Sequence, residues 1–220
     1  MIGSLRPHGT SSSTNSDLLR RVFVRRVHEL VLLGYARMNH SAYAKSQEPV
    51  ITGDLVNAID SVLSERIEPW MSMFSVHDDP PISDGKRKGK RRRRVDLRLD
   101  SGEFIPRARF QFECKRLGRR HTVKVYPGSE GLGCFLRGDY ATEDDQAGMI
   151  GYVQSGSLSD WGTRIEKELM KSPDVYALVP KTEFVAGMPR SATCHKHHSQ
   201  HHRTTLGRVI IIDHMLLTFY

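Results

Sequence analysis

The stretches VDLRLD at residues 95–100 and FQFECK at residues 110–115 alternate apolar and polar side chains without interruption. Such alternation predicts β-strands with one buried and one polar face, because successive side chains of a strand point to opposite sides. Ser101 and Gly102 begin the connection between the two stretches, which favours an antiparallel pair. If both strands belong to one sheet, Asp96 can lie beside Glu113 on its polar surface.

Asp96 and Glu113 would repel each other at such a distance and raise one carboxyl pKa, unless a cation lies between them. Mg²⁺ prefers oxygen ligands and commonly takes one or two protein carboxylates together with substrate phosphate oxygens. A bound ion of this kind lowers the pKa of an attacking water and neutralises charge that develops on the phosphate. Lys115, on the same face as Glu113, is placed to orient that water or to stabilise the transition state.

This arrangement resembles the PD-(D/E)xK nucleases, the restriction-endonuclease-like superfamily, whose signature is an acidic residue on one strand and a (D/E)xK triplet on the next. The matching residues are Asp96 and, about 17 residues later, Glu113, Cys114 and Lys115. The resemblance implies that Asp96, Glu113 and the main chain of Cys114 bind Mg²⁺ or Mn²⁺, and that Lys115 assists the nucleophilic water. It also implies a further metal-binding carboxylate from an early helix, for which Glu48 is the candidate.

The resemblance covers roughly residues 48–115, about a third of the chain. It departs from the motif at residues 94–95, where the motif's name has a proline and this chain has Arg94 and Val95. A surface Asp and a Glu-x-Lys triplet on a strand also occur as ordinary solvated charges. The flanking apolar alternation, the helix ahead and the adjacent positive charge favour the nuclease interpretation.

A run of basic residues lies directly before the first strand. The chain has 33 Lys and Arg against 25 Asp and Glu, which gives a formal net charge of +8, and the run equals this excess. Its members are Lys86, Arg87, Lys88, Lys90, Arg91, Arg92, Arg93 and Arg94. A patch of this kind indicates a polyanionic partner, since each neutralised phosphate releases counterions. We expect it to bind nucleic acid, with a solvated loop or a localisation signal as the alternatives.

Helical periodicity flanks the two strands. From Ser16, a candidate N-cap, apolar residues recur at helical spacing as far as Gly34. Thr52 is the candidate N-cap of a second helix that ends before Pro69. A helical region that is interrupted around Gly156 is expected over 146–170, and β-branched runs at 175–179 and 209–212 suit strands. The predicted fold is therefore α/β, a small mixed central sheet flanked by helices, with the restriction-endonuclease-like core that the resemblance implies.

A length of 220 residues predicts one domain. We expect a flexible tail at residues 1–15 and a single nuclease-like domain at 16–220, with a basic loop at 77–94 and a His-rich loop at 194–203. Three cysteines without CxxC pairing predict a reducing, cytoplasmic compartment. The apolar stretches fall short of the ~18 residues of a membrane span, so we expect a soluble protein with no membrane partner.

Two further segments have weaker signals. Cys194 stands beside a cluster of five histidines, but no second cysteine pair completes a closed zinc site, so a polar loop is the preferred interpretation. Glycines at positions 148 and 151 favour close packing of a helix on the sheet. Four residues are open candidates for contacts with phosphate or base, namely Tyr126, Arg137, Tyr140 and Gln146.

These features predict a Mg²⁺- or Mn²⁺-dependent nuclease whose substrate is DNA. Bacterial defence against foreign DNA is one setting that fits the resemblance. Because no separate recognition domain is evident, we expect little sequence specificity and control by a partner, either another protein or a second copy of this chain in a homo-oligomer. Two alternatives stay open, a catalytically inactive nucleic-acid-binding module with the same fold and an interaction subunit whose basic run contacts an acidic protein.

Overall fold

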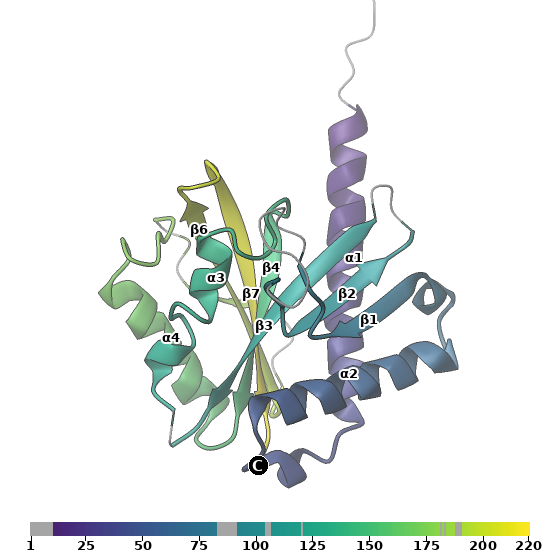
Figure 1. The fold of residues 1–220 in the computed structure, drawn as a ribbon, viewed down its shortest axis with the longest axis horizontal. Coiled ribbons are helices and arrows are strands. Elements are labelled where there is room, and N and C mark those ends of the chain that lie inside the picture. The colour runs from purple at the N-terminus through teal and green to yellow at the C-terminus, as the bar shows by residue number, and fades with distance from the viewer. Residues whose placement is uncertain are drawn as a thin grey trace, which may run out of the picture.

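The structure is a computed structural model that describes residues 11–82, 92–103, 107–119, 121–180, 182, 184–187 and 191–220. It contains a seven-stranded sheet with helices packed on it (Figure 1). The helices are α1 (Ser11–Ala36), η1 (His40–Tyr43), α2 (Glu48–Glu65), η2 (Pro69–Met73), η4 (Val123–Val125), α3 (Leu132–Leu136) and α4 (Leu158–Lys171). The strands are β1 (Phe74–Asp78), β2 (Leu97–Ser101), β3 (Ala108–Leu117), β4 (Gln146–Val153), β5 (Val185–Gly187), β6 (Cys194–Arg203) and β7 (Arg208–Thr218).

The sheet is mixed, with strand order β1-β2-β3-β4-β7-β6-β5. Strands β1, β2 and β3 form an antiparallel meander, whereas β4 runs parallel to both β3 and β7. Strand β6 pairs antiparallel with β7 and β5. The predicted α/β class, with a mixed sheet flanked by helices, is confirmed, although the sheet is larger than expected. The predicted antiparallel pair is confirmed as β2 and β3, with Leu97 opposite Phe112.

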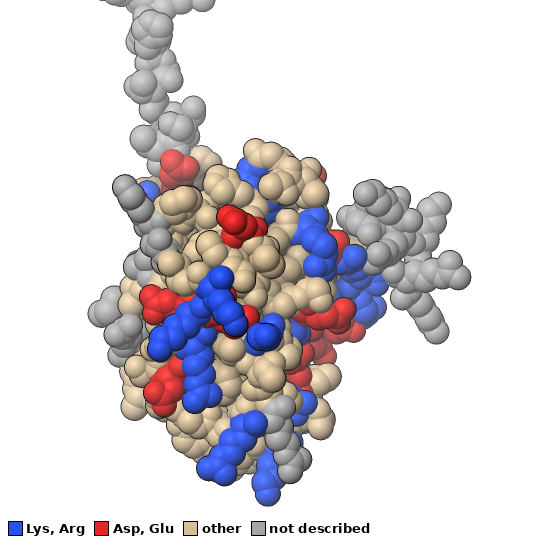
Figure 2. Space-filling view, turned by 90° about the vertical axis from the view of Figure 1, so that its left-hand side faces the viewer, with Lys and Arg blue, Asp and Glu red and all other residues tan. Residues whose placement is uncertain are grey.

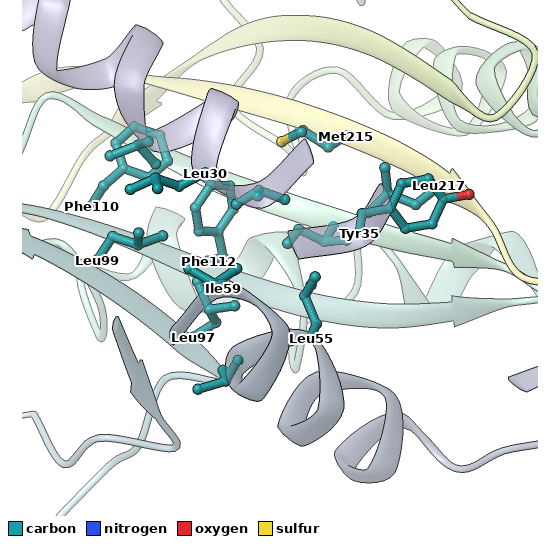
Figure 3. Close-up of a cluster of buried hydrophobic side chains, with 14 of the residues drawn as sticks. Leu30, Tyr35, Leu55, Ile59, Leu97, Leu99, Phe110, Phe112, Met215 and Leu217 are labelled. Carbon is teal, nitrogen blue, oxygen red and sulfur yellow. The ribbon is translucent and has the colours of Figure 1, made fainter. Parts of the chain in front are cut away.

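Two hydrophobic clusters cover the two faces of the sheet. Helices α1 and α2 pack in one cluster against alternate strand residues, among them Leu97, Phe110 and Phe112 (Figure 3). Helices α3 and α4 pack in the other, where Ile165 lies with Met149 of β4. Because strand side chains alternate, Glu113 and Lys115 face the α3 and α4 side of the sheet.

Helix α1 is longer at both ends than predicted. It begins at Ser11, so residues 11–15 belong to the helix and not to a flexible tail, while residues 1–10 lie outside the described residues. Ser, Thr and Asn lower helix propensity by only a few tenths of a kcal/mol each, which a long helix tolerates. Gly34 lies inside the helix and does not end it. The glycine permits close approach to α2, because a Cβ there would lie 2.5 Å from Ile59 Cγ1. Within the described residues, no helix is long and apolar enough to cross a membrane.

Helix α2 begins at Glu48 with Gln47 as its N-cap, so the prediction of Thr52 as the N-cap is wrong. Pro49 stands in the first turn, where the N–H that proline lacks has no helical partner to lose. Thr52 lies inside the helix, and its hydroxyl donates to the Glu48 carbonyl oxygen at 3.0 Å. The correction matters for function, because it places Glu48 at the N-terminus of the helix.

The region 146–170, predicted to be helical, consists of strand β4 followed by helix α4. Because a hydrophobic cluster covers each face of the sheet at β4, both of its faces are buried and no polar alternation marks it as a strand. Its glycines make room for side chains of the sheet. A Cβ on Gly148 would lie 2.2 Å from the Phe112 ring, and one on Gly151 would lie 2.7 Å from Leu117 Cδ1. The glycines therefore serve packing, although not against a helix as expected.

Gly148→Ala is expected to lower the free energy of unfolding by about 3 kcal/mol, at the upper end of the usual cost of overpacking a core. The Phe112 ring is fully buried and cannot move away freely. Gly53→Ala is the control: a Cβ there would meet only Asp78 Oδ2, at 3.8 Å, and Ala should gain up to about 1 kcal/mol in a helix interior. Urea unfolding of both variants measures the contrast, and unchanged stability of Gly148→Ala would contradict the packing of Phe112 on β4.

The His-rich segment is strand β6, so the prediction of a loop at 194–203 is wrong. Alternate side chains of this strand enter the interior on the α4 side, where polar atoms satisfy one another. Ser199 Oγ lies 2.7 Å from His201 Nε2 and 2.8 Å from His214 Nε2. His201 Nδ1 lies 2.8 Å from the Tyr176 carbonyl oxygen, and Tyr126 Oη lies 3.1 Å from His214 Nδ1. The polar sequence thus indicated a loop, whereas the fold buries these side chains in a continuous series of hydrogen bonds.

The donor and acceptor of each hydrogen bond in this series follow from the carbonyl oxygen of Tyr176 at its end. A carbonyl oxygen only accepts, so His201 donates from Nδ1 to Tyr176 and accepts at Nε2. The Ser199 hydroxyl then donates to His201 and accepts from His214 Nε2, while His214 Nδ1 accepts from Tyr126. Both histidines are satisfied in their neutral forms. Consistent with this, burial lowers the pKa of His201 to about 4 and that of His214 well below its ordinary value of 6.5.

The buried histidines are expected to make the protein sensitive to acid. Between pH 6.5 and about 4, His201 binds a proton in the unfolded chain but not in the folded one, so stability falls as pH decreases. Thermal unfolding between pH 4 and 7 measures this loss. His201→Gln should flatten the profile relative to wild type, whereas His202→Gln, at an exposed position of the same strand, should not. Parallel profiles for wild type and His201→Gln would contradict a neutral, buried His201.

Two more predictions need correction. Residues 175–179 form a turn and not a strand, with one isolated bridge between Leu178 and His201. Ala177 adopts a left-handed conformation with φ 47°, which interrupts an extended run. The basic loop predicted at 77–94 is partly sheet, since β1 extends to Asp78 and Pro81 pairs with Arg94 in an isolated bridge. Residues 83–91 of that segment lie outside the described residues.

Candidate functional site

Two carboxylates lie along the edge of β3 that β2 leaves uncovered. Pairing between the two strands ends at the first residue of β2, so later amides of β3 on that side bind other acceptors. The Cys114 N–H donates to Asp96 Oδ2 at 2.7 Å, and the Arg116 N–H donates to Glu48 Oε2 at 3.2 Å. The main chain thus orients both carboxylates, as outer hydrogen bonds do for metal ligands.

Lys115 lies in the middle of the predicted site residues. Its Nζ donates to Glu113 Oε1 at 2.8 Å, to the Cys114 carbonyl oxygen at 2.7 Å and to Glu48 Oε1 at 3.1 Å. Asp96 Oδ2 is 3.9 Å away. Glu113 and Lys115 are only 5% and 8% exposed. The structure therefore brings all five residues predicted for catalysis and metal binding to one point.

The charges at this point do not balance. Burial and then the neighbouring Asp96 raise the pKa of Glu113 to about 8, despite its contact with Lys115. Burial also raises the pKa of Asp96. Burial alone would lower the pKa of Lys115, but Glu113, Glu48 and Asp96 together outweigh burial and raise it. One ammonium faces the carboxyl groups of Glu48, Asp96 and Glu113. Even with Glu113 protonated, two negative charges face one positive charge, and this excess favours an additional cation.

The donor atoms suit a hard divalent cation, which prefers carboxylate and carbonyl oxygens. Glu113 Oε2 is buried and has no hydrogen-bond partner among the described residues, so it is available to a ligand. Within the same part of the chain, no group of three or more His, Cys, Asp or Glu side chains is arranged so that it could hold a metal ion. In the carboxylate cluster of Glu48, Asp96 and Glu113, Lys115 Nζ lies among the acidic side chains and also donates to the Cys114 carbonyl oxygen.

Only the end of the basic run lies in the described residues. Arg93 is paired with Asp139 and Arg94 with Asp79, so these two arginines fix the segment ahead of β2. Arg92 also lies in the described residues, whereas the predicted contacts at Lys86, Arg87, Lys88, Lys90 and Arg91 fall outside them. Figure 2 shows Lys and Arg side chains intermixed with Asp and Glu on the face that it views. Positive charge does not dominate that face.

Of the four weaker candidates, Tyr140 lies near the cluster. Burial and then the charge of Glu113 raise its pKa, and its hydroxyl donates to the Arg94 carbonyl oxygen at 2.7 Å. This bond holds the chain just before Asp96. The other three have partners elsewhere in the fold, namely Tyr126, Arg137 and Gln146.

Sequence reasoning missed the main-chain amides of Cys114 and Arg116 that orient the carboxylates. No sequence signal could reveal them, because every residue except proline supplies the same donor. It also missed a polar group formed by His28, Lys196 and Asp213. His28 lies on α1, far in the sequence from the β6–β7 hairpin that carries Lys196 and Asp213, so no local pattern joins the three residues.

Comparisons with protein-family models, curated proteins and solved structures found no match to this chain. The functional interpretation therefore depends on the motif residues and on the geometry of the cluster. Both lead to the same set, Glu48, Asp96, Glu113, Cys114 and Lys115.

Proposed function

We propose that this chain is a metal-dependent nuclease of the restriction-endonuclease-like class. The observation that supports the proposal best is the convergence of Asp96, Glu113 and Glu48 on Lys115, with more negative than positive charge at a buried point. A purely structural ion pair does not need this excess, since buried carboxylates that repel each other cost stability. A site that cleaves phosphodiesters needs this excess of negative charge, because the excess binds a divalent cation.

Asp96, Glu113 and the Cys114 carbonyl oxygen would hold Mg²⁺ or Mn²⁺, with Glu48 binding directly or through water. The ion, when bound, lowers the pKa of a water molecule and neutralises charge on the phosphate. The Lys115 ammonium would donate hydrogen bonds to the nucleophilic water or to a phosphate oxygen in the transition state.

DNA is the substrate that we propose, with the basic run as its contact surface. The run precedes Asp96 directly in the sequence, so phosphates held there would lie close to the cluster. Contacts of this kind add affinity without base preference. Defence against foreign DNA, with control by a partner or by homo-oligomer formation, is the setting that fits such an unspecific nuclease.

A single assay separates this proposal from its alternatives. Purified protein is incubated with plasmid DNA, linear DNA and RNA in the presence of Mg²⁺, Mn²⁺ or EDTA. We expect cleavage of DNA with either metal and none with EDTA. Binding without cleavage under every condition would favour an inactive nucleic-acid-binding module. Neither binding nor cleavage would favour an interaction subunit.

Glu48→Gln is expected to raise the Mg²⁺ concentration required for cleavage by about 10- to 100-fold, the usual effect of weakening the surroundings of a metal. Stability should change little, because a carboxylate at a helix N-terminus contributes only ~0.3–1 kcal/mol through the helix dipole. Cleavage rates over a Mg²⁺ titration, together with the melting temperature, measure both effects. Glu65→Gln at the exposed end of the same helix is the control, and normal cleavage by Glu48→Gln at low Mg²⁺ would remove Glu48 from the site.

A further inference from the structure

A groove of about 550 Å³ lies along α1 on the face of the sheet opposite the carboxylate cluster. Its lining comes from one side of α1, which includes Arg21, His28 and Leu32, and from Gln146 of β4, Lys196 of β6 and Asp213 of β7. The volume is within the range of small-molecule sites, which combine apolar walls with a few convergent polar groups. Because Met215 packs in the α1 cluster, the alternation of β7 places Asp213 on the α1 side, whereas Glu113 faces the other way.

The floor of the groove is a hydrogen-bonded polar group. Lys196 Nζ donates to His28 Nδ1 at 2.7 Å, so the imidazole carries its proton on Nε2, which lies 3.3 Å from Asp213 Oδ2. Gln146 Nε2 donates to the same oxygen at 2.7 Å. The charge of Asp213 is thus engaged from two sides. An ammonium has three N–H donors, and in the described part of the chain Lys196 uses one, which leaves two for a ligand in the groove.

The rim of the groove adds positive charge to that of the Lys196 ammonium. Arg21 and Arg25 are exposed and form no ion pair with any residue that the structure describes. They lie one turn apart on α1, on the side that also carries His28 and Leu32. Glu29 is the one acidic residue of the rim. Cations therefore outnumber anions around the opening, and the groove is complementary to a negatively charged group.

We propose that this groove binds a small organic anion with an apolar body. The acidic group would accept hydrogen bonds from Lys196 and lie near Arg21 and Arg25, while the apolar body would contact Val24, Leu32 and Leu33. Leu33 is 38% exposed, and burying its free surface against such a body is favourable. The proposal does not depend on nuclease activity, because the groove and the carboxylate cluster share no residue.

Titration with 8-anilino-1-naphthalenesulfonate, an organic anion with an apolar body, tests the proposal. We expect saturable fluorescence with one site per chain, and weaker binding of N-phenyl-1-naphthylamine, which lacks the sulfonate. Lys196→Met should weaken binding of the anion about tenfold, since hydrogen bonds between charged groups are stronger than neutral ones. Arg21→Glu with Arg25→Glu, both at exposed positions, should weaken it without affecting the fold. Lys167→Met, on the exposed side of α4, is the control and should bind normally.

Three results would overturn this assignment. The first is equal binding of the anion and its neutral analogue, or unchanged binding by both the Lys196 and the double arginine variant. The second is displacement of the probe by duplex DNA, which would make the groove a nucleic-acid surface. The third is release of the bound probe when the chain self-associates, with self-association followed by sedimentation. This result would make the groove a contact between copies. Glu113→Gln should bind the probe like wild type, so failure here and failure of the nuclease proposal are distinguishable.

Discussion

Glu113→Gln is expected to abolish metal-dependent cleavage and, in the same molecule, to stabilise the metal-free protein at neutral pH. An amide cannot replace the charge of a carboxylate that holds a divalent ion. If about 4 kcal/mol of transition-state stabilisation is lost, cleavage falls about a thousandfold. Initial rates on plasmid DNA at saturating Mg²⁺ measure this effect, with Glu166→Gln on the exposed side of α4 as the control.

The gain in stability follows from the sign of the pKa shift. Burial and Asp96 raise the pKa of Glu113 to about 8, above its ordinary value of 4.5. Between these two values the folded protein keeps a proton that the unfolded chain releases, so wild-type stability falls as pH rises from 4.5 to 8. Gln has no proton to lose, and the difference in melting temperature should therefore grow in favour of the variant over this window. A variant that is less stable than wild type at pH 8 without metal would contradict the raised pKa.

The part of the fold that could be predicted consists of the strands and helices whose apolar residues recur with the period of a strand or a helix. Strands β2 and β3 have one apolar and one polar face, so Phe112 and Glu113 identify their opposite sides directly. If both strands belong to one sheet, the same alternation predicts that Asp96 can lie beside Glu113. The same reasoning located α1 and α2, although not their first residues, because helix starts depend on local contacts such as those of Pro49.

The other half of the sheet could not be predicted, for two physical reasons. Strand β4 is buried on both faces, and its apolar run around Ile150 has no period that separates a strand from a helix. Strand β6 is rich in histidine, and its polarity indicated a loop because the partners of Ser199 and His201 lie on β7 and in a distant turn. The hydrogen bonds that offset the cost of burying these polar side chains join residues distant in the sequence, so they leave no local pattern in it.

The carboxylate cluster shows the same limit on a smaller scale. Asp96, Glu113 and Lys115 flank the paired part of one hairpin, and the alternation of side chains predicted that Asp96 can lie beside Glu113 if both strands belong to one sheet. Glu48 could be named only from a resemblance, because its position depends on how the N-terminus of α2 packs beside β3. The hydrogen bond from the Arg116 amide to Glu48 is a property of the assembled fold.

Lys115→Met should produce the second large effect, a loss of cleavage together with a stability that depends on metal. Groups that transfer or orient protons typically contribute about 10²- to 10⁴-fold to rate, so cleavage should become nearly undetectable. Without metal, removal of the ammonium leaves the carboxylates of Glu48 and Asp96 uncompensated. Breaking a buried ion pair in this way costs roughly 3–5 kcal/mol. Thermal unfolding in EDTA measures this cost, and Lys167→Met provides a matched control.

Added Mg²⁺ separates the two roles of Lys115. If the carboxylates form a cation site, Mg²⁺ at about 100 times its Kd should restore roughly 2.7 kcal/mol to the variant by mass action. Wild type should gain less, because its ammonium already contacts Glu113 Oε1 and the Cys114 carbonyl oxygen and must give up these contacts when the ion binds. The melting temperature of the variant should therefore rise more steeply with Mg²⁺ than that of wild type. A Lys115→Met protein that Mg²⁺ does not stabilise would show that the excess negative charge at this point does not bind a divalent cation.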